Sequence, residues 1–172
     1  MKPSDIKILP NHFDTYIKKV EDVELFDALE KYGKKYLLAE RDKFIQLGDK
    51  VYAPGKWTVK DIIQHIIDAE RIFSYRALTF ARNDQTLLPG FEEDDYATAA
   101  NGIKRELNEL LDEFYTVRES TMKLFKSFSP EVLMREGKGP LGNISVGSLG
   151  FTIVGHAIHH MGVLKERYYG LV

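Results

Sequence analysis

The residues best suited to chemistry in this sequence are its histidines, three of which lie within residues 156–160. His156 and His160 are four residues apart, and on an α-helix this spacing places two imidazoles one turn apart on the same face. One helix can then direct two nitrogen ligands at a single divalent metal ion. We therefore take this pair as the start of a candidate metal site.

A third ligand must come from another segment, and His65 is the best candidate. It lies on the apolar stripe of a segment with helical periodicity. A single buried histidine is usually explained by a hydrogen bond to a neighbour. Several imidazoles in an apolar interior each carry a free-energy cost, however, and one shared cation removes it. We predict that His65, His156 and His160 bind one divalent metal ion.

Several familiar catalytic sites do not fit the residues around these histidines. A zincin needs Glu directly after the first histidine, where this chain has Ala157. A carboxylate di-iron bundle needs Glu three residues before a histidine, where this chain has Ile62 and Ile153. The chain has no cysteine, which excludes thiolate nucleophiles and Cys-containing zinc sites. The sequence therefore offers no nucleophile or base of these kinds.

Two arginines, Arg76 and Arg167, are candidate substrate-binding residues. Each follows a candidate ligand by 11 residues, His65 in the first case and His156 in the second. At 100° per residue this interval is close to three full turns, so each arginine points near the histidine face, roughly 16 Å along the helix axis. An arginine at a helix end is often a solvated cap. Both interpretations stay open: a cap, or an anchor for a substrate carboxylate.

The other polar motifs either have a structural explanation or leave their role open. Asp68 and Glu70 lie close to His65 in the sequence and either hold its imidazole in place or form surface ion pairs. The acidic run at residues 92–95 is typical of a solvated loop. The match to Gly-x-Gly-x-x-Gly at residues 137–142 follows no predicted strand, so we expect no phosphate site there.

Four segments have the periodicity and boundary signals of long helices, which we predict over residues 21–47, 58–81, 102–128 and 146–168. Thr58 and Ser145 are natural N-caps for the second and fourth of them. The segment 82–101 contains Pro89-Gly90 and is long for a connection. Strand-like alternation is scarce. We therefore expect an all-α four-helix bundle with a long crossover between its second and third helices.

Length and composition favour one domain spanning residues 1–172. There are 24 Lys and Arg residues against 26 Asp and Glu residues, for a net charge of −2, so nucleic acid is a poor partner. The most apolar stretch, residues 148–158, is far shorter than the roughly 20 residues of a membrane helix, and no apolar run resembles a signal peptide. We expect a soluble cytoplasmic protein with no membrane partner.

The sequence resembles the DinB-like superfamily of four-helix metalloproteins over nearly the whole chain. The resemblance rests on four motifs: Trp57-Thr58-Val59 with a histidine eight residues after the tryptophan, His65-Ile-Ile-Asp68-Ala-Glu70, Leu88-Pro89-Gly90-Phe91, and His156-x-x-x-His160. It implies an up-down-down-up course. It also implies a divalent metal, often nickel or zinc, held by residues matching His65, His156 and His160, with His159 a neighbour of the site. Homodimers are common in this superfamily, and an aromatic content of 12% agrees with one.

Members that resemble this chain are mostly thiol S-transferases or isomerases that use bacillithiol, mycothiol or glutathione. Three neutral imidazoles leave the charge of a divalent ion uncompensated, which favours a bound thiolate over a thiol. We therefore expect an enzyme that joins a small-molecule thiol to an electrophile. A metal-dependent hydrolase and a non-enzymatic metal or stress-response binding protein remain as alternatives.

Overall fold

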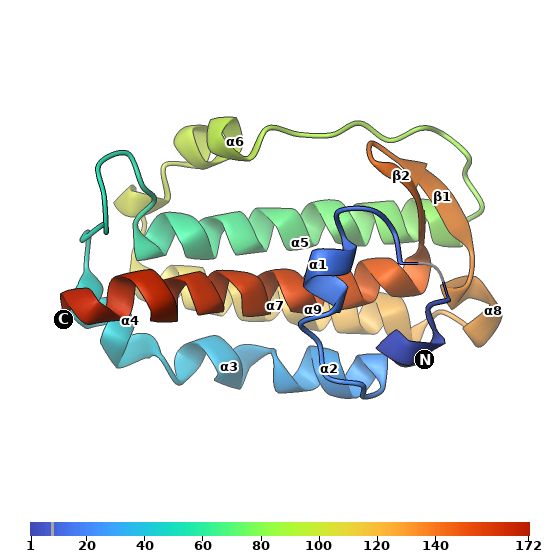
Figure 1. Cartoon of the computed structure of the whole chain (residues 1–172), viewed down its shortest axis with the longest axis horizontal. Helices are drawn as coiled ribbons and strands as arrows, with labels where there is room; N and C mark the ends of the chain where they lie inside the picture. Colours follow the sequence, from blue (N-terminus) through green and yellow to red (C-terminus); the bar gives the residue numbers. More distant parts are fainter. Residues whose placement is uncertain (8) are drawn as a thin grey trace.

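Four helical segments lie side by side in the computed structural model, which describes residues 1–7 and 9–172 (Figure 1). This confirms the predicted all-α four-helix bundle. The first segment consists of three short helices, and each of the other three is one long helix. Their bounds are α2 (Leu25–Lys31), α3 (Lys34–Leu38) and α4 (Arg41–Leu47), then α5 (Val59–Ala81), α7 (Leu107–Lys126) and α9 (Val146–Val163).

The four segments follow an up-down-down-up course. In Figure 1 the first segment runs toward the end where the C-terminus lies, α5 and α7 both run away from that end, and α9 returns to it. Two successive parallel helices require a connection that travels the length of the bundle. The chain after α5 does this: it passes back along α5 to α6 (Glu93–Ala100) before α7 begins.

The predicted helix starts at residues 58 and 145 are confirmed by their caps. The Thr58 hydroxyl accepts a hydrogen bond from the Asp61 amide, and the Asp61 carboxylate accepts one from the Thr58 amide. The Ser145 hydroxyl accepts a hydrogen bond from the Ser148 amide at 3.1 Å. After α9 the helical path continues through residues 164–168 as a π-turn. These local signals set the ends of the two helices that carry the histidines.

The single helix predicted over residues 21–47 is wrong. Its first break follows Lys31, where Nη1 of Arg118 donates to the carbonyl oxygens of Leu29 (3.3 Å) and Tyr32 (2.7 Å). The same guanidinium donates to both carboxylate oxygens of Glu70 at 2.8 and 2.9 Å. The apolar periodicity of residues 21–47 cannot report these contacts, because they come from a side chain of α7.

The crossover also differs from the prediction. The run 92–95, interpreted as loop, contributes the first turn of α6, where carboxylates are favoured by the helix dipole. The third helix begins at Leu107 and not near Gly102, because residues 102–104 form a separate 3-10 turn. The acidic composition therefore marked a helix N-terminus and not only a solvated surface.

The glycine-rich segment before α9 forms a β-hairpin that the sequence analysis missed. Strands β1 (Glu136–Gly139) and β2 (Gly142–Ser145) pair antiparallel after a short helix, α8 (Pro130–Leu133). A Cβ on Gly137 would lie 1.9 Å from the ring of Phe80, and Gly142 has a φ of +115°. These glycines thus allow close packing on α5 and a tight turn.

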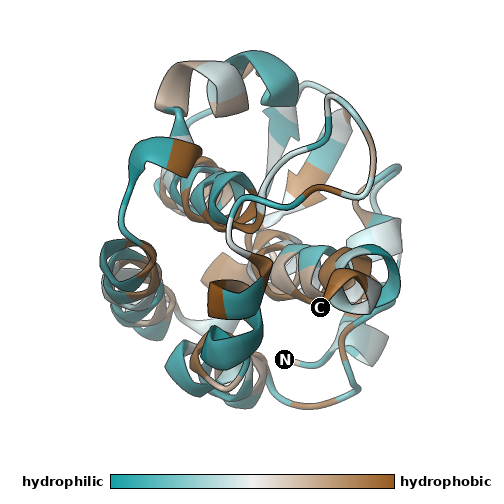
Figure 2. Ribbon diagram, turned by 90° about the vertical axis from the view of Figure 1, so that its left-hand side faces the viewer, coloured by the Kyte–Doolittle hydropathy of each residue, from teal (hydrophilic) through white to brown (hydrophobic). Residues whose placement is uncertain are grey.

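The apolar sides of the helices face the inside of the bundle (Figure 2). The core divides along its length: one cluster contains Phe73 of α5 and Val154 of α9, the other Ile66 of α5 and Met161 of α9. The two clusters meet near the middle of the bundle. No helix in the described part of the chain is long and apolar enough to cross a membrane.

Candidate metal centre

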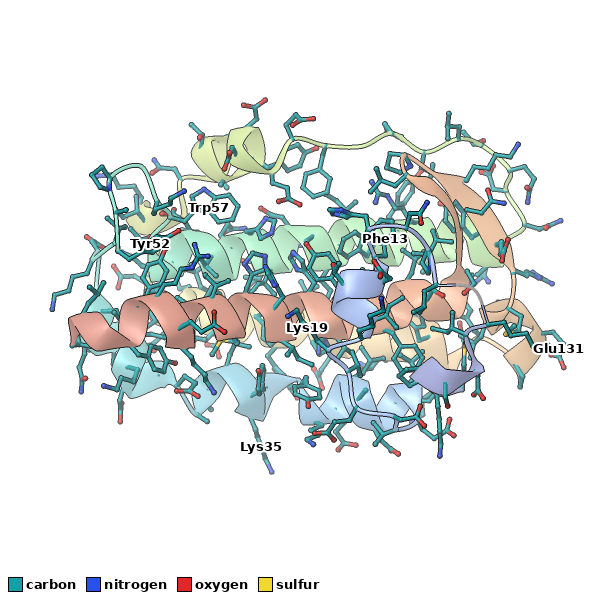
Figure 3. All side chains as sticks on the ribbon, viewed as in Figure 1. Phe13, Lys19, Lys35, Tyr52, Trp57 and Glu131 are labelled. Atoms are coloured by element: carbon teal, nitrogen blue, oxygen red, sulfur yellow. The ribbon has the colours of Figure 1, made fainter. Side chains whose placement is uncertain are left out.

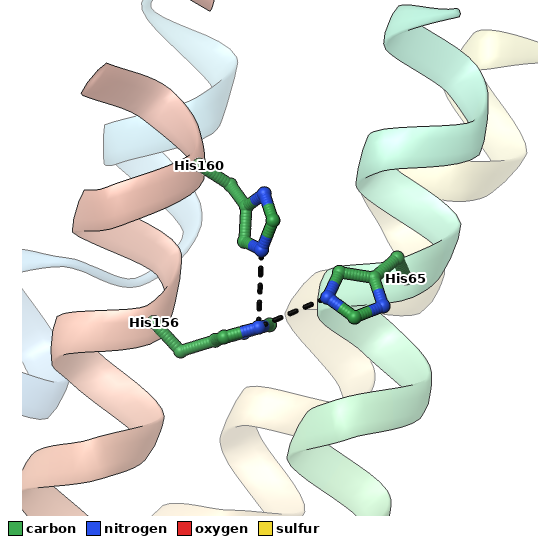
Figure 4. A group of neighbouring side chains, drawn as sticks. All are labelled: His65, His156 and His160. Carbon is green, nitrogen blue, oxygen red and sulfur yellow. Dashed lines mark hydrogen bonds between the residues drawn. The ribbon is translucent and has the colours of Figure 1, made fainter. Parts of the chain in front are cut away.

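The structure brings together the three histidines that the sequence singled out. His65 comes from α5, and His156 and His160 come from α9, which packs antiparallel to α5 (Figure 1, Figure 4). Nε2 of His156 lies 3.0 Å from Nε2 of His65 and 3.1 Å from Nε2 of His160. One ligand atom from each of the three lies within 4.8 Å of the others.

Hydrogen bonds alone do not explain this arrangement. An imidazole nitrogen carries either one proton or one lone pair, so Nε2 of His156 can form only one of its two short contacts as a hydrogen bond. A metal ion with Zn–N bonds of about 2.0–2.1 Å separates its nitrogen ligands by about 2.9 Å at right angles and about 3.3 Å in a tetrahedron. The observed 3.0 and 3.1 Å fall between these values. Two of the three spacings therefore match those of nitrogen ligands on one divalent ion, and the third is within 4.8 Å.

Burial keeps the three imidazoles neutral. His65 and His156 are each only 3% exposed. Burial lowers the pKa of His65 to about 4 and the pKa of His160 to about 2, and it holds the pKa of His156 well below its usual range. The charge of each protonated neighbour would lower the pKa of His156 and His160 further. Each ring is thus neutral at neutral pH and has one nitrogen with a free lone pair, the protonation state in which histidine binds a metal ion.

Aromatic side chains enclose the cluster. The Trp57 ring lies 4.9 Å from the His65 ring, and the Tyr16 and Phe73 rings lie 5.2 and 5.9 Å from the His156 ring. Tyr16 reaches this place because α1 (Asp14–Ile17) packs closely on α9 at Gly155, where a Cβ would lie 2.0 Å from the Tyr16 carbonyl oxygen. Figure 3 shows Trp57 beside the start of α5. These rings limit the movement of the imidazoles.

Neither Asp68 nor Glu70 hydrogen-bonds to the histidine cluster in the described part of the chain. Glu70 is 140° around the helix from His65, and it is buried against Arg118 instead. The Asp68 carboxylate accepts a hydrogen bond from Gln64 at 3.0 Å. The idea that these acids hold the imidazole of His65 is therefore wrong, and the Glu70 pair is internal and not on the surface.

The two candidate arginines occupy different places. Arg76 is 4% exposed and lines a cavity that also contacts His156. Arg167 is exposed, donates a hydrogen bond to the Tyr52 hydroxyl at 3.0 Å and lies over its ring. In Figure 3 Tyr52 is near the end of the bundle where the chain terminates, whereas Phe13, which lines the Arg76 cavity, lies toward the other end. Of the two, only Arg76 shares a cavity with a candidate ligand.

The cavity beside His156 has a volume of about 240 Å³. Its walls come from the N-terminal segment, α5, the crossover and the tip of the hairpin. Glu93, the first residue of α6, stands at its rim, where desolvation raises the pKa of the carboxyl group. Sequence reasoning missed both Glu93 and Tyr16, because nothing local to either segment tells where it meets the histidines. The motif Leu88-Pro89-Gly90-Phe91 was the one signal that the crossover matters.

Comparisons with known proteins agree with this fold. A sequence model of the DinB superfamily matches residues 36–164. The structure is similar to that of YfiT from Bacillus subtilis, described as a probable metal-dependent hydrolase with an unusual four-helix bundle topology. That similarity has a TM-score of 0.71 at 15% sequence identity and covers 96% of this chain and 91% of YfiT. None of the curated proteins matches this chain.

Proposed function

Because the chain belongs to the DinB superfamily, we propose that it is a metal-dependent thiol S-transferase whose divalent ion is held by His65, His156 and His160. The observation that carries the proposal is the convergence of three neutral imidazoles in a set without a carboxylate. A zinc or nickel ion bound there supplies uncompensated positive charge, which favours the deprotonated form of a thiol.

The side chains around the cluster support such a reaction. His65 and His156 are buried and His160 is partly buried. The three neutral imidazoles add no negative charge that would weaken the attraction of a thiolate. Trp57, Tyr16 and Phe73 pack against His65 and His156 and restrict their imidazoles. The cavity at His156 leaves room for an electrophile. In the transfer, the thiol loses its proton to solvent, and its sulfur forms a bond to the electrophilic carbon as that carbon releases its leaving group, a halide ion in the case of an aryl halide. The chain therefore needs no nucleophile of its own.

A metal-dependent hydrolase is the second candidate, and Glu93 favours it. Hydrolysis requires a group that takes a proton from water and returns one to the leaving group. The raised pKa of Glu93 and its place in the cavity with His156 suit that task. The fold is also that of YfiT, itself described as a probable hydrolase. A non-enzymatic metal-binding protein is the third candidate, and it would show metal binding without turnover.

One assay separates these candidates. The purified protein, loaded with zinc or nickel, is mixed with bacillithiol, mycothiol or glutathione and an aryl halide, and separately with esters and amides. We expect thiol-dependent turnover that His160→Ala abolishes and His159→Ala retains, since His159 lies next to the cluster without belonging to it. Hydrolysis of esters or amides without thiol, reduced by Glu93→Gln, would replace the transferase with the hydrolase.

A further inference from the structure

Arg76 is a buried cation without a carboxylate partner within 4.0 Å in the described part of the chain. Nη2 donates to the Pro89 carbonyl oxygen at 2.8 Å, and the guanidinium lies 5.7 Å from the Phe73 ring centre. Arg118, which is similarly buried, instead pairs with both oxygens of Glu70. Burying a guanidinium without a counter-ion is costly, and burial lowers the pKa of Arg76. The arrangement suits an arginine whose anion comes from outside the chain.

The residues around Arg76 indicate what kind of anion would fit beside it. Its cavity continues to His156 between aromatic rings, among them Phe13, Tyr16 and Phe91. The carboxylates on the cavity lining, Glu92 and Glu93, are exposed. The buried part of the cavity therefore combines one positive charge with apolar walls. A guanidinium has five N–H donors, so Arg76 retains donors for a two-pronged contact with a carboxylate.

We infer that this cavity binds a small organic acid whose carboxylate pairs with Arg76 and whose apolar body lies between the aromatic rings, next to His156. The inference rests on the proposed function and names the class of its second substrate. At about 240 Å³ the cavity is smaller than the roughly 300–1,000 Å³ of sites for drug-sized ligands. It is larger than the roughly 150 Å³ that holds benzene. One ring or a short chain with a carboxylate matches this volume.

Binding of phenylacetate tests the inference, with phenylacetamide and phenyl phosphate as comparisons. The full chain is first freed of metal by a chelator, so that no carboxylate can bind an ion, and dissociation constants are measured by NMR titration. We expect phenylacetate to bind about tenfold or more tightly than the neutral amide. We expect Arg76→Met to lower its affinity about tenfold and to remove this preference, and Arg76→Lys to restore part of it.

Arg167→Met is the matched control. Arg167 also lies over an aromatic ring, 5.3 Å from the centre of Tyr52, but it is not part of the cavity, so this variant should bind phenylacetate like the natural protein. Should Arg76→Met fail to fold, the affinities of the natural protein for phenylacetate and phenylacetamide still test the inference. The inference is overturned if phenylacetate does not bind, if acid and amide bind equally, or if phenyl phosphate binds more tightly. Because the metal is removed, a failed metal site would not change these outcomes.

Discussion

The three histidines are neutral at neutral pH because burial lowers the pKa of each of them. This burial arises because their neighbours on α5 and α9 belong to the apolar core. The sequence predicted this grouping because the spacing of His156 and His160 is local to one helix. The prediction that His65 lies beside them needed one further assumption, that the apolar faces of the two helices meet in the core.

The pH dependence of stability tests the burial of these histidines. In metal-free protein the pKa of His65 is about 4, against about 6.5 for an unfolded chain. Below pH 6.5 the unfolded chain therefore binds protons that the native chain does not. We expect the free energy of unfolding to fall with decreasing pH from 6.5 to 4, by up to about 1.4 kcal/mol per pH unit for each such histidine.

Urea denaturation across this pH range measures the effect. A His65→Phe variant should show a shallower slope, since it removes one of the shifted groups. A free energy of unfolding that stays constant between pH 6.5 and 4 in the natural protein would contradict the buried, neutral cluster.

The buried pair of Arg118 and Glu70 is the second prediction at the residue scale. Arg118→Met leaves the Glu70 carboxylate and the carbonyl oxygens of Leu29 and Tyr32 without their donor. Breaking a buried pair in this way costs about 3–5 kcal/mol. Arg71→Met is the control, because Arg71 is half exposed in its pair with Glu113 and should cost under about 1 kcal/mol. Similar unfolding midpoints in urea for the two variants would refute the conclusion that the buried Arg118–Glu70 pair stabilises the fold.

At the scale of elements, local signals were enough for α5 and α9 and insufficient elsewhere. Thr58 and Ser145 mark helix starts by hydrogen bonds within three residues. At the break after α2, the carbonyl oxygen of Tyr32 accepts a hydrogen bond from Arg118, which is 86 residues further along the chain. The hairpin depends on Gly137 meeting Phe80. A pattern within one segment cannot report contacts of this range, so these elements were missed.

The contact between α1 and α9 gives a prediction with an internal control. A Cβ on Gly155 would lie 2.0 Å from the Tyr16 carbonyl oxygen, whereas a Cβ on Gly162 meets nothing within 4 Å. Gly155→Ala should therefore destabilise by about 1–3 kcal/mol through overpacking and move Tyr16 away from His156. Gly162→Ala should be neutral or stabilise by up to about 1 kcal/mol, because alanine favours the helix.

Thermal unfolding of the two glycine variants measures the difference. The contact assignment fails if Gly155→Ala is as stable as Gly162→Ala.

At the scale of the whole molecule, the bundle brings the crossover over α5, and this places Glu93 and the cavity beside the histidines. The sequence indicated a crossover by its length but not where it would lie. The residues that line the cavity come from five separated parts of the chain, so their meeting is a property of the fold. The grouping of the three histidines was therefore predictable from the sequence, and the cavity beside them was not.

The homodimer expected from the family resemblance stays a prediction. Large apolar side chains are exposed along α5 and the crossover, with Tyr75 60%, Leu87 66% and Tyr96 48% exposed. A second copy would cover such residues and so gain free energy from their burial. Light scattering after gel filtration should give about 40 kDa, twice the 19.8 kDa of the chain. A single species of one chain mass at micromolar concentration would contradict it.

Measuring the metal content of the protein tests whether the three histidines hold one divalent ion. The natural protein, His160→Ala and His159→Ala are dialysed against zinc, then against buffer, and bound zinc is measured per folded chain, with competition against a chromophoric chelator for affinity. We expect one ion per chain in the natural protein and in His159→Ala, and a loss of affinity of about 100-fold or more in His160→Ala. Folded natural protein that retains no zinc or nickel, or equal retention by His160→Ala, would contradict it.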